Sequence, residues 1–122
     1  MGYYMTQRET IFFIDRFNLV NVEKAIRDLE PGSWVTESRE KDYLEQLFQN
    51  WRWSVEFDTA GNINNIMFEG EKLGDEKKFF NAIAPFVRKG SYIEMTGEDG
   101  SLWRWEFDGS MCIENVPNIS WD

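Results

Sequence analysis

Two stretches of the chain alternate bulky apolar residues with polar ones. Each begins with Trp-Arg-Trp and leads into Glu-Phe-Asp, over residues 51–58 and 103–108. Because successive side chains of a strand point to opposite faces, both indoles of a stretch lie on one face and its arginine on the other. We therefore expect two strands, each with an apolar face turned to the core and a polar face turned to solvent.

The first of these strands is expected to form a hairpin with residues 63–68. The intervening Thr-Ala-Gly-Asn sequence has the composition of a turn. A four-residue loop there sets Trp53 opposite Phe68 and Val55 opposite Ile66. This register keeps the apolar side chains of both strands on the same face.

The second strand is expected to pair with residues 91–96 through a turn that contains Asp99-Gly100. A two-residue loop would place the apolar residues of the two strands on opposite faces. A three-residue loop, with Gly100 in the left-handed conformation, matches both faces at once. We therefore choose the three-residue loop, which creates the pairs Met95–Trp103, Ile93–Trp105 and Glu94–Arg104.

Three segments show the residue spacing of amphipathic helices. They are residues 21–29, with Asn21 as the N-cap and Pro31-Gly32 as the terminator, residues 38–50, and a segment from Gly74 or Asp75 that contains Pro85. The proline is expected to kink the third helix or to divide off its last turn. Further strands are expected over 9–14 and 111–116, and residues 33–36 fit a short strand or a turn.

This order of elements predicts a single α+β domain over residues 1–122. We expect an antiparallel sheet of about five to six strands with about three helices packed on one face. The helix–hairpin order occurs twice, which suggests an αββ pseudo-repeat. The two copies arose either by a distant duplication or independently, as two strands that pack in the same way. We slightly favour the second interpretation.

Charge and composition narrow the function. The net charge is −9, which disfavours direct binding of nucleic acids or of an anionic membrane surface and suits a partner that is itself basic. The chain has no histidine, so the most common general base and metal ligand is missing. Its single cysteine, Cys112, is interpreted as a buried structural thiol in a reducing compartment. We therefore expect neither a cofactor nor a metal.

Carboxylates provide the remaining route to catalysis. Glu98 and Asp99 share a tight turn, and a second acidic group surrounds the Gly-Glu-Lys-Leu-Gly sequence at residues 70–74. Neither group has the spacing of a metal-binding loop, and residues 70–74 lack the spacing of a phosphate-binding loop. We interpret both groups as turn and helix N-terminal charges, and an enzyme built on carboxylates alone stays an alternative.

The tryptophans allow two interpretations. Packed under the helices they form the core, and exposed beside Arg52 or Arg104 they would stack a nucleobase. We favour the core, because strict alternation is typical of a half-buried sheet. The opposite face then becomes the candidate surface for a protein partner, with the residues Arg52, Glu56, Glu94, Arg104, Glu106 and Asp108.

Several sequence strings also resemble a known group of proteins. These strings are Gly-Glu-Lys-Leu-Gly-Asp-Glu at 70–76, Ala-Ile-Ala-Pro-Phe-Val at 82–87, and Gly-Ser-Tyr-Ile-Glu-Met at 90–95 before Gly-Glu-Asp-Gly and Trp-Arg-Trp. Together they resemble a group of small, acidic, uncharacterised proteins carried by phages, prophages and integrative elements of bacteria. The resemblance brings no activity, cofactor or catalytic residue, and it implies a cytoplasmic accessory protein of a mobile element.

Our leading hypothesis is a non-enzymatic accessory protein that binds a protein partner. Its most concrete form is an acidic inhibitor of a bacterial defence or nucleic-acid-binding protein. A small-molecule binder that grips a nucleotide-like ligand by Trp and Arg stacking is the first alternative. A regulatory or structural subunit of the element is the second.

Overall fold

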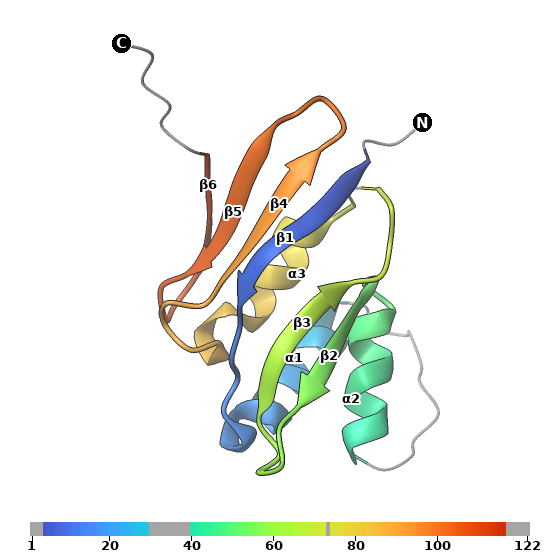
Figure 1. The fold of residues 1–122 in the computed structure, drawn as a ribbon. Helices are drawn as coiled ribbons and strands as arrows, with labels where there is room; N and C mark the ends of the chain where they lie inside the picture. Colours follow the sequence, from blue (N-terminus) through green and yellow to red (C-terminus); the bar gives the residue numbers. More distant parts are fainter. Residues whose placement is uncertain (1–3, 30–39, 73, 117–122) are drawn as a thin grey trace.

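The computed structural model describes residues 4–29, 40–72 and 74–116, which form an α+β fold of strands and helices (Figure 1). The strands are β1 (Met5–Ile11), β2 (Trp53–Phe57), β3 (Ile63–Phe68), β4 (Tyr92–Gly97), β5 (Leu102–Phe107) and β6 (Cys112–Asn115). The helices are α1 (Leu19–Leu29), α2 (Glu40–Gln49) and α3 (Glu76–Ile83), and η1 (Arg16–Asn18) and η2 (Ala84–Phe86) are 3-10 turns. Within the described ranges, no helix is long and apolar enough to cross a membrane.

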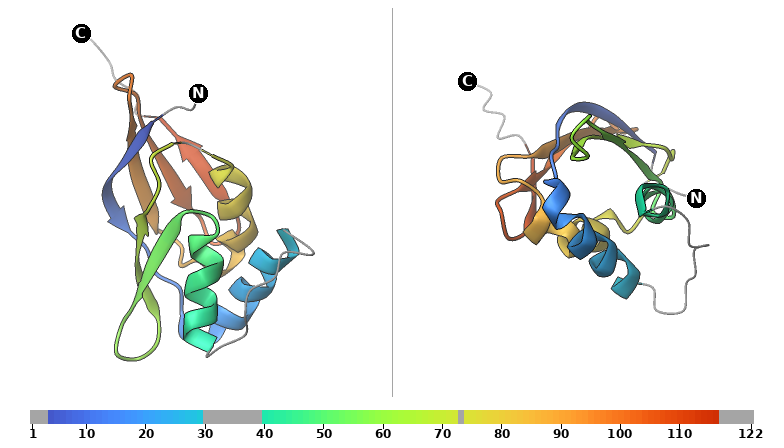
Figure 2. Two further views of the ribbon diagram at one scale, coloured as in Figure 1. Left: turned by 90° about the vertical axis from the view of Figure 1, so that its right-hand side faces the viewer. Right: turned by 90° about the horizontal axis from the view of Figure 1, so that it is seen from below.

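The strands form two antiparallel sheets rather than one. The larger has four strands in the order β1-β4-β5-β6, and the smaller is the β2–β3 hairpin. All three helices lie on the same side of these sheets, as two perpendicular views show (Figure 2). The predicted α+β class with helices on one face is therefore confirmed, and the two tryptophan hairpins belong to different sheets.

Gln7 of β1 links the larger sheet to β3 of the smaller sheet, although the backbones of β1 and β3 do not pair. Its side chain donates a hydrogen bond from Nε2 to the carbonyl oxygen of Ile66 (2.8 Å) and accepts one at Oε1 from the backbone N–H of Phe68 (2.7 Å). The amide thus replaces a missing backbone partner for β3 on the side that faces β1. A single isolated pair between Ile14 and Ile63 makes a second link at the other end.

The predicted residue pairs of both hairpins are confirmed, but the register of the first hairpin shifts between Glu56 and Phe57, so Phe57 pairs with Ile63 and the predicted four-residue loop is not kept. Trp53 pairs with Phe68 and Val55 with Ile66 in the first hairpin. In the second hairpin, the observed pairs include Met95–Trp103, Ile93–Trp105 and Glu94–Arg104. Gly100 has a φ of 85°, as the three-residue loop requires. Matching both faces of a strand was therefore sufficient to set the register of the second hairpin.

Several predicted boundaries were wrong. The first helix begins at Leu19 after η1, whose N-cap is Asp15, so Asn21 lies inside the helix. The first strand covers Met5–Ile11 rather than residues 9–14. Strand β2 begins at Trp53, because Arg52 turns the chain with a φ of 70° and separates Trp51 from the strand. The expectations for residues 31–36 lie outside the described residues.

The third helix follows its sequence signals. Asp75 is its N-cap residue, and Pro85 divides off the separate 3-10 turn η2 after Ile83. Because proline cannot donate the hydrogen bond that continues an α-helix, the change of helix type at this point is expected. Residues Phe79, Phe80 and Ile83 of this helix are completely buried.

Three of the four tryptophans of the repeated motif lie in the core. Trp53, Trp103 and Trp105 are at most 7% exposed, and the rings of Trp53 and Trp105 meet edge to face at 6.1 Å. Phe80 of α3 contacts both of these rings, at 5.1 Å and 5.0 Å. The two sheets and α3 therefore share one aromatic core.

Candidate functional site

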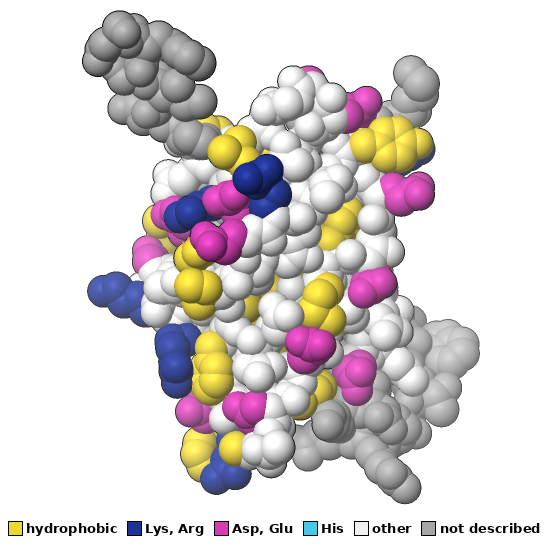
Figure 3. Space-filling view, in the orientation of Figure 1, with side chains coloured by type: hydrophobic (Ala, Val, Ile, Leu, Met, Phe, Trp, Pro, Cys, Tyr) yellow, Lys and Arg dark blue, Asp and Glu magenta, His cyan; other side chains and the backbone are white. Residues whose placement is uncertain are grey.

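The larger sheet has one face that none of the described elements covers. We call this the outer face. It follows from the alternation along β4 and β5, in which the residues between the buried ones point away from the helices. Its charged side chains are Arg8, Glu9, Glu94, Arg104 and Glu106, and the phenol of Tyr92 lies beside them. Charged side chains of both signs gather over the strands on this side of the molecule (Figure 3).

A β-bulge in β1 brings two adjacent charged residues to the outer face. Gln7 pairs with Met95 and Thr10 pairs with Ile93, so β1 contains one residue more than β4 over this interval. As a result, Arg8 and Glu9 both lie opposite Glu94. Bulges of this kind redirect side chains without ending the sheet.

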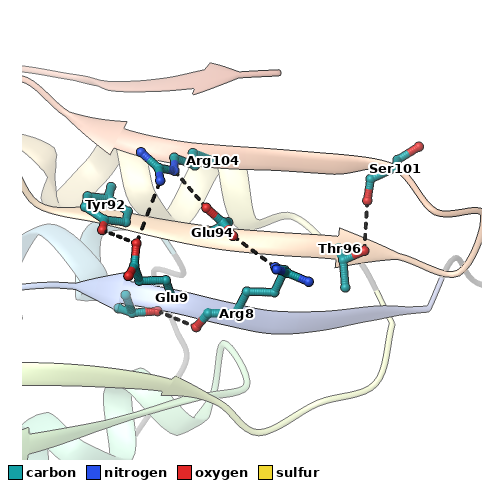
Figure 4. Close-up of polar contacts among 8 residues, drawn as sticks. Arg8, Glu9, Tyr92, Glu94, Thr96, Ser101 and Arg104 are labelled. Atoms are coloured by element: carbon teal, nitrogen blue, oxygen red, sulfur yellow. Dashed lines mark hydrogen bonds and ion pairs between the residues drawn. The ribbon is translucent and has the colours of Figure 1, made fainter. Parts of the chain in front are cut away.

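These residues form a connected network with Glu94 at its centre (Figure 4). Nε of Arg8 lies 2.9 Å from one carboxylate oxygen of Glu94, and Nε of Arg104 lies 3.0 Å from the other. Arg104 also lies 3.8 Å from Glu9 and above the ring of Tyr92, at 4.3 Å from its centre. The hydroxyl of Tyr92 donates to Glu9 over 2.6 Å. Three strands thus hold one another's polar side chains in fixed positions.

The network shifts the pKa values of its members. Hydrogen bonds from Arg8 and Arg104 hold the pKa of Glu94 below its ordinary value. The hydrogen bond that Tyr92 donates to Glu9 raises the pKa of the Tyr92 hydroxyl. Glu94 raises the pKa of Arg104 in turn. These shifts keep the Glu94 carboxylate and the Arg104 guanidinium charged, and the Tyr92 hydroxyl neutral, at neutral pH.

We predict that removing either arginine raises the pKa of Glu94. Because the folded-state pKa is lowered, the charged carboxylate stabilises the fold above its ordinary pKa, and this contribution disappears as the pH falls through the lowered pKa. Carbon-13 NMR titration of Glu94 in Arg8→Ala and Arg104→Ala measures the change, with Arg88→Ala as the control. An unchanged titration in both variants would contradict the network.

The outer face and its turns have an excess of negative charge. The outer face and the turns between β4, β5 and β6 contain six carboxylates and two arginines. The seventh carboxylate of these strands, Glu114, lies on the opposite face, where it accepts a hydrogen bond from the indole of Trp105. Both arginines already contact carboxylates. Glu106 accepts a hydrogen bond from Asn115, and no described cation pairs with it. This surface therefore attracts positive charge.

Apolar side chains border the charged residues along β6. Met111, Ile113 and Val116 are 53%, 41% and 70% exposed. Next to them, a cavity of about 310 Å³ is lined by residues of β4, β5 and β6, among them Leu102 and Glu106. An apolar border beside a charged surface is typical of a protein interface.

The six residues predicted for a partner surface do not share one face. The structure brings Glu94, Arg104 and Glu106 together on the outer face. Glu56 lies on β2, where it accepts a hydrogen bond from Asn65. Asp108 accepts hydrogen bonds from the backbone of Ser110 and Met111, which hold its pKa below the usual range.

The two residues of the predicted turn site stabilise local backbone. Glu98 accepts a hydrogen bond from the backbone N–H of Tyr4, and Asp99 accepts one from the backbone N–H of Ser101. Both side chains are exposed. Asp99 thus forms the turn interaction that the sequence suggested.

Arg52, the counterpart of Arg104 in the repeated motif, has a different position. Its guanidinium group lies 2.7 Å from Glu76, which is only 1% exposed, and also donates a hydrogen bond to the carbonyl oxygen of Lys72. A side chain at Gly74 would place its Cβ 1.9 Å from this guanidinium group. Gly70, Lys72 and Gly74 therefore lie around Arg52, which explains the glycine at position 74.

Three members of the network were not predicted from the sequence: Arg8, Glu9 and Tyr92. The bulge brings Arg8 to the outer face, and a strictly alternating pattern gives no sign of an extra residue. The unbroken polar run at residues 6–10 was the available signal, because a regular strand over a core would have interrupted it with an apolar residue.

The positions of the tryptophans bear on the nucleotide-stacking alternative. Trp53, Trp103 and Trp105 are buried, so their faces are occupied by protein. Trp51 is partly exposed, but its ring stacks on Phe79 with an interplanar angle of 13° and a centroid distance of 5.3 Å. The three buried rings thus provide no open platform for a base, and Phe79 covers one face of Trp51.

Cys112 lies in β6, with 8% of its surface exposed. Burial raises the pKa of its thiol to about 12, so the reactive thiolate is scarce at neutral pH. We predict that iodoacetamide at pH 8 alkylates Cys112 in urea but scarcely at all in the folded protein. Mass spectrometry of both samples measures this, and rapid alkylation of the folded protein would show that the thiol is accessible.

Within the described ranges, no group of three or more Cys, His, Asp or Glu side chains is arranged to hold a metal ion. Comparison of the chain with protein-family models, curated proteins and solved structures found no match. The surfaces of the protein itself therefore carry the information on its function.

Proposed function

We propose that this protein acts by binding another protein through the outer face of its four-stranded sheet. The observation that carries the proposal is the uncovered, preorganised network around Glu94, with its surrounding excess of carboxylates. A network whose side chains already hold one another loses little conformational freedom when a partner binds. The exposed apolar border along β6 adds surface that benefits from burial.

The partner is proposed to have a basic contact surface. Six carboxylates against two arginines give the outer face and its turns a negative field, and the whole chain has a net charge of −9. Such a field accelerates association with a positively charged surface and disfavours acidic ones. The guanidinium groups of Arg8 and Arg104 are positive charges at fixed positions within this negative surface. They would favour a partner that has carboxylates at matching positions.

A bacterial nucleic-acid-binding protein has the required surface chemistry. Proteins of this class carry basic grooves for phosphate groups, and an acidic sheet can compete for such a groove. Together with the resemblance to proteins of mobile elements, this supports a cytoplasmic accessory protein that inhibits a defence or nucleic-acid-binding protein.

Affinity purification with two charge reversals tests the proposal. Glu106→Lys alters the outer face, and Asp28→Lys alters an exposed position of α1. Each variant changes the net charge from −9 to −7, so only the position of the change differs. The tagged wild-type protein is expected to retain a stoichiometric basic partner from a bacterial lysate, as judged by mass spectrometry.

We expect Asp28→Lys to retain this partner and Glu106→Lys to weaken binding by roughly tenfold, because a charge at an interface changes association strongly. Biolayer interferometry with the purified partner gives both affinities. Equal affinities of the two variants would place the interface elsewhere, and an acidic or absent partner would contradict the proposed chemistry.

A further inference from the structure

A second concave site lies away from the outer face, where η1, α1 and α2 meet the β2–β3 hairpin. This region is at the lower end of the molecule in Figure 1. The cavity there has a volume of about 330 Å³, within the range of small-molecule sites. Five segments contribute to it: η1, α1, α2, β2 and the hairpin turn. A ligand in this cavity would therefore contact parts of the chain that are distant in sequence.

The walls of the cavity are mainly apolar. Phe17, Leu19, Leu44 and Phe57 line it, and Leu44 is buried while Leu19 and Phe57 are only partly so. Phe17 is 76% exposed, although it is one of the largest apolar side chains of the protein. Apolar surface left open beside a concavity gains stability when a ligand removes it from water.

One guanidinium group stands at this cavity in a fixed position. The backbone N–H of Arg16 donates to Oδ1 of Asn62 over 2.8 Å, and its Nη1 donates to the carbonyl oxygen of Ala60 over 3.1 Å. The group also lies 4.8 Å from the centre of the Phe17 ring. Within the described residues, no carboxylate forms an ion pair with Arg16.

The other charge that lines the cavity is partly neutralised. Glu23 of α1 lies 3.7 Å from Arg27, one turn further along the same helix. Of the two charged residues that line the cavity, Arg16 is therefore the one that has no ion-pair partner among the described residues. A guanidinium group in this situation binds carboxylates better than any neutral group of similar shape.

We infer that this cavity binds a small molecule that has an apolar body and one carboxylate, such as a fatty acid or an aryl acid. The apolar body lies against Phe17, Leu19 and Leu44, and the carboxylate pairs with Arg16. The site shares no element with the outer face, so it is independent of the proposed protein-binding function.

Titration with three probes of equal carbon number tests this inference. Decanoate, decan-1-ol and decylammonium each have ten carbons, with a negative, a neutral and a positive head. The apolar chain of decanoate is one methylene shorter, because its tenth carbon is the carboxylate, and this difference works against the expected preference. Nitrogen-15 NMR of the wild-type protein follows the backbone amides, at probe concentrations below micelle formation. We expect decanoate to shift the amides of Arg16, Phe17 and Gly61 saturably and to bind roughly tenfold more tightly than decan-1-ol.

Two variants separate the charge from the apolar wall. Arg16→Gln is expected to remove the preference for decanoate and leave the affinity for decan-1-ol unchanged, and Arg88→Gln serves as the control for the loss of one positive charge. Phe17→Ser, at an exposed position that the fold does not need, is expected to weaken both probes. Binding of decylammonium as tight as that of decanoate, or no saturable shift at these amides, would overturn the inference.

Discussion

Replacing Arg52 with alanine is expected to lower the free energy of unfolding by about 2–3 kcal/mol, because it leaves the buried carboxylate of Glu76 without its ion-pair partner. The value is at the lower end for a buried pair, since 37% of the Arg52 side chain is exposed and water screens part of the interaction. The same replacement at Arg104 is expected to leave the stability close to that of the wild type, because its contacts lie on the solvated outer face.

This pair of variants is unusually well matched. Both arginines stand between two tryptophans of the same repeated motif, and both variants remove the same side chain. Urea unfolding followed by tryptophan fluorescence measures the two free energies. In the double variant Arg52→Ala with Glu76→Gln, part of the loss is expected to be recovered, because the unpaired buried charge is gone. Equal stability losses for Arg52→Ala and Arg104→Ala would contradict the assigned roles.

Replacing Gln7 with alanine is expected to lower the free energy of unfolding by about 2 kcal/mol, because two backbone groups of β3 lose their partner. The carbonyl oxygen of Ile66 and the N–H of Phe68 both bond to the Gln7 amide across the junction of the two sheets. Asn65→Ala provides a control, since it also removes a bonded amide, but one whose partner Glu56 is exposed.

We expect Asn65→Ala to lower the free energy of unfolding by about 0.5 kcal/mol or less. Hydrogen exchange provides a second, local measurement, in which the amide of Phe68 exchanges faster in Gln7→Ala than in the wild type. If Gln7→Ala and Asn65→Ala have the same stability and the same exchange at Phe68, the Gln7 amide does not join the sheets.

The register of the second hairpin could be predicted because both faces of its strands carry information. Shifting the second hairpin by one residue would have turned Met95 away from Trp103 and separated Glu94 from Arg104. One alignment alone satisfied the core face and the solvent face, and the structure has that alignment. The same reasoning identified the buried tryptophans and the polar outer face of β4 and β5.

The different positions of Arg52 and Arg104 could not be predicted from the repeated motif. An alternating pattern does not show where a strand begins, and Trp51 belongs to the turn that follows α2. Arg52 adopts a left-handed backbone conformation there, which is uncommon for a residue other than glycine. Its partner Glu76 is 24 residues away, and only the folded chain brings the two together.

The outer-face network depends on a β-bulge that the alternation of apolar and polar residues does not show. The extra residue in β1 brings Arg8 and Glu9 to the same interval opposite Glu94, and it accompanies the sideways position of Gln7 toward β3. Bulges add one residue without changing composition, so periodicity alone does not reveal them. Three of the eight residues chosen from the sequence therefore lie on the outer face.

The most direct test of the protein-binding proposal is NMR mapping of the complex with the captured partner. Nitrogen-15 spectra that include arginine Nε resolve both the backbone of β4, β5 and β6 and the side chains of Arg8 and Arg104. Binding through the outer face predicts that these signals shift or broaden while the amides of α1 and α2 stay unchanged. Shifts confined to α1 and α2, with Arg8 and Arg104 unaffected, would contradict it.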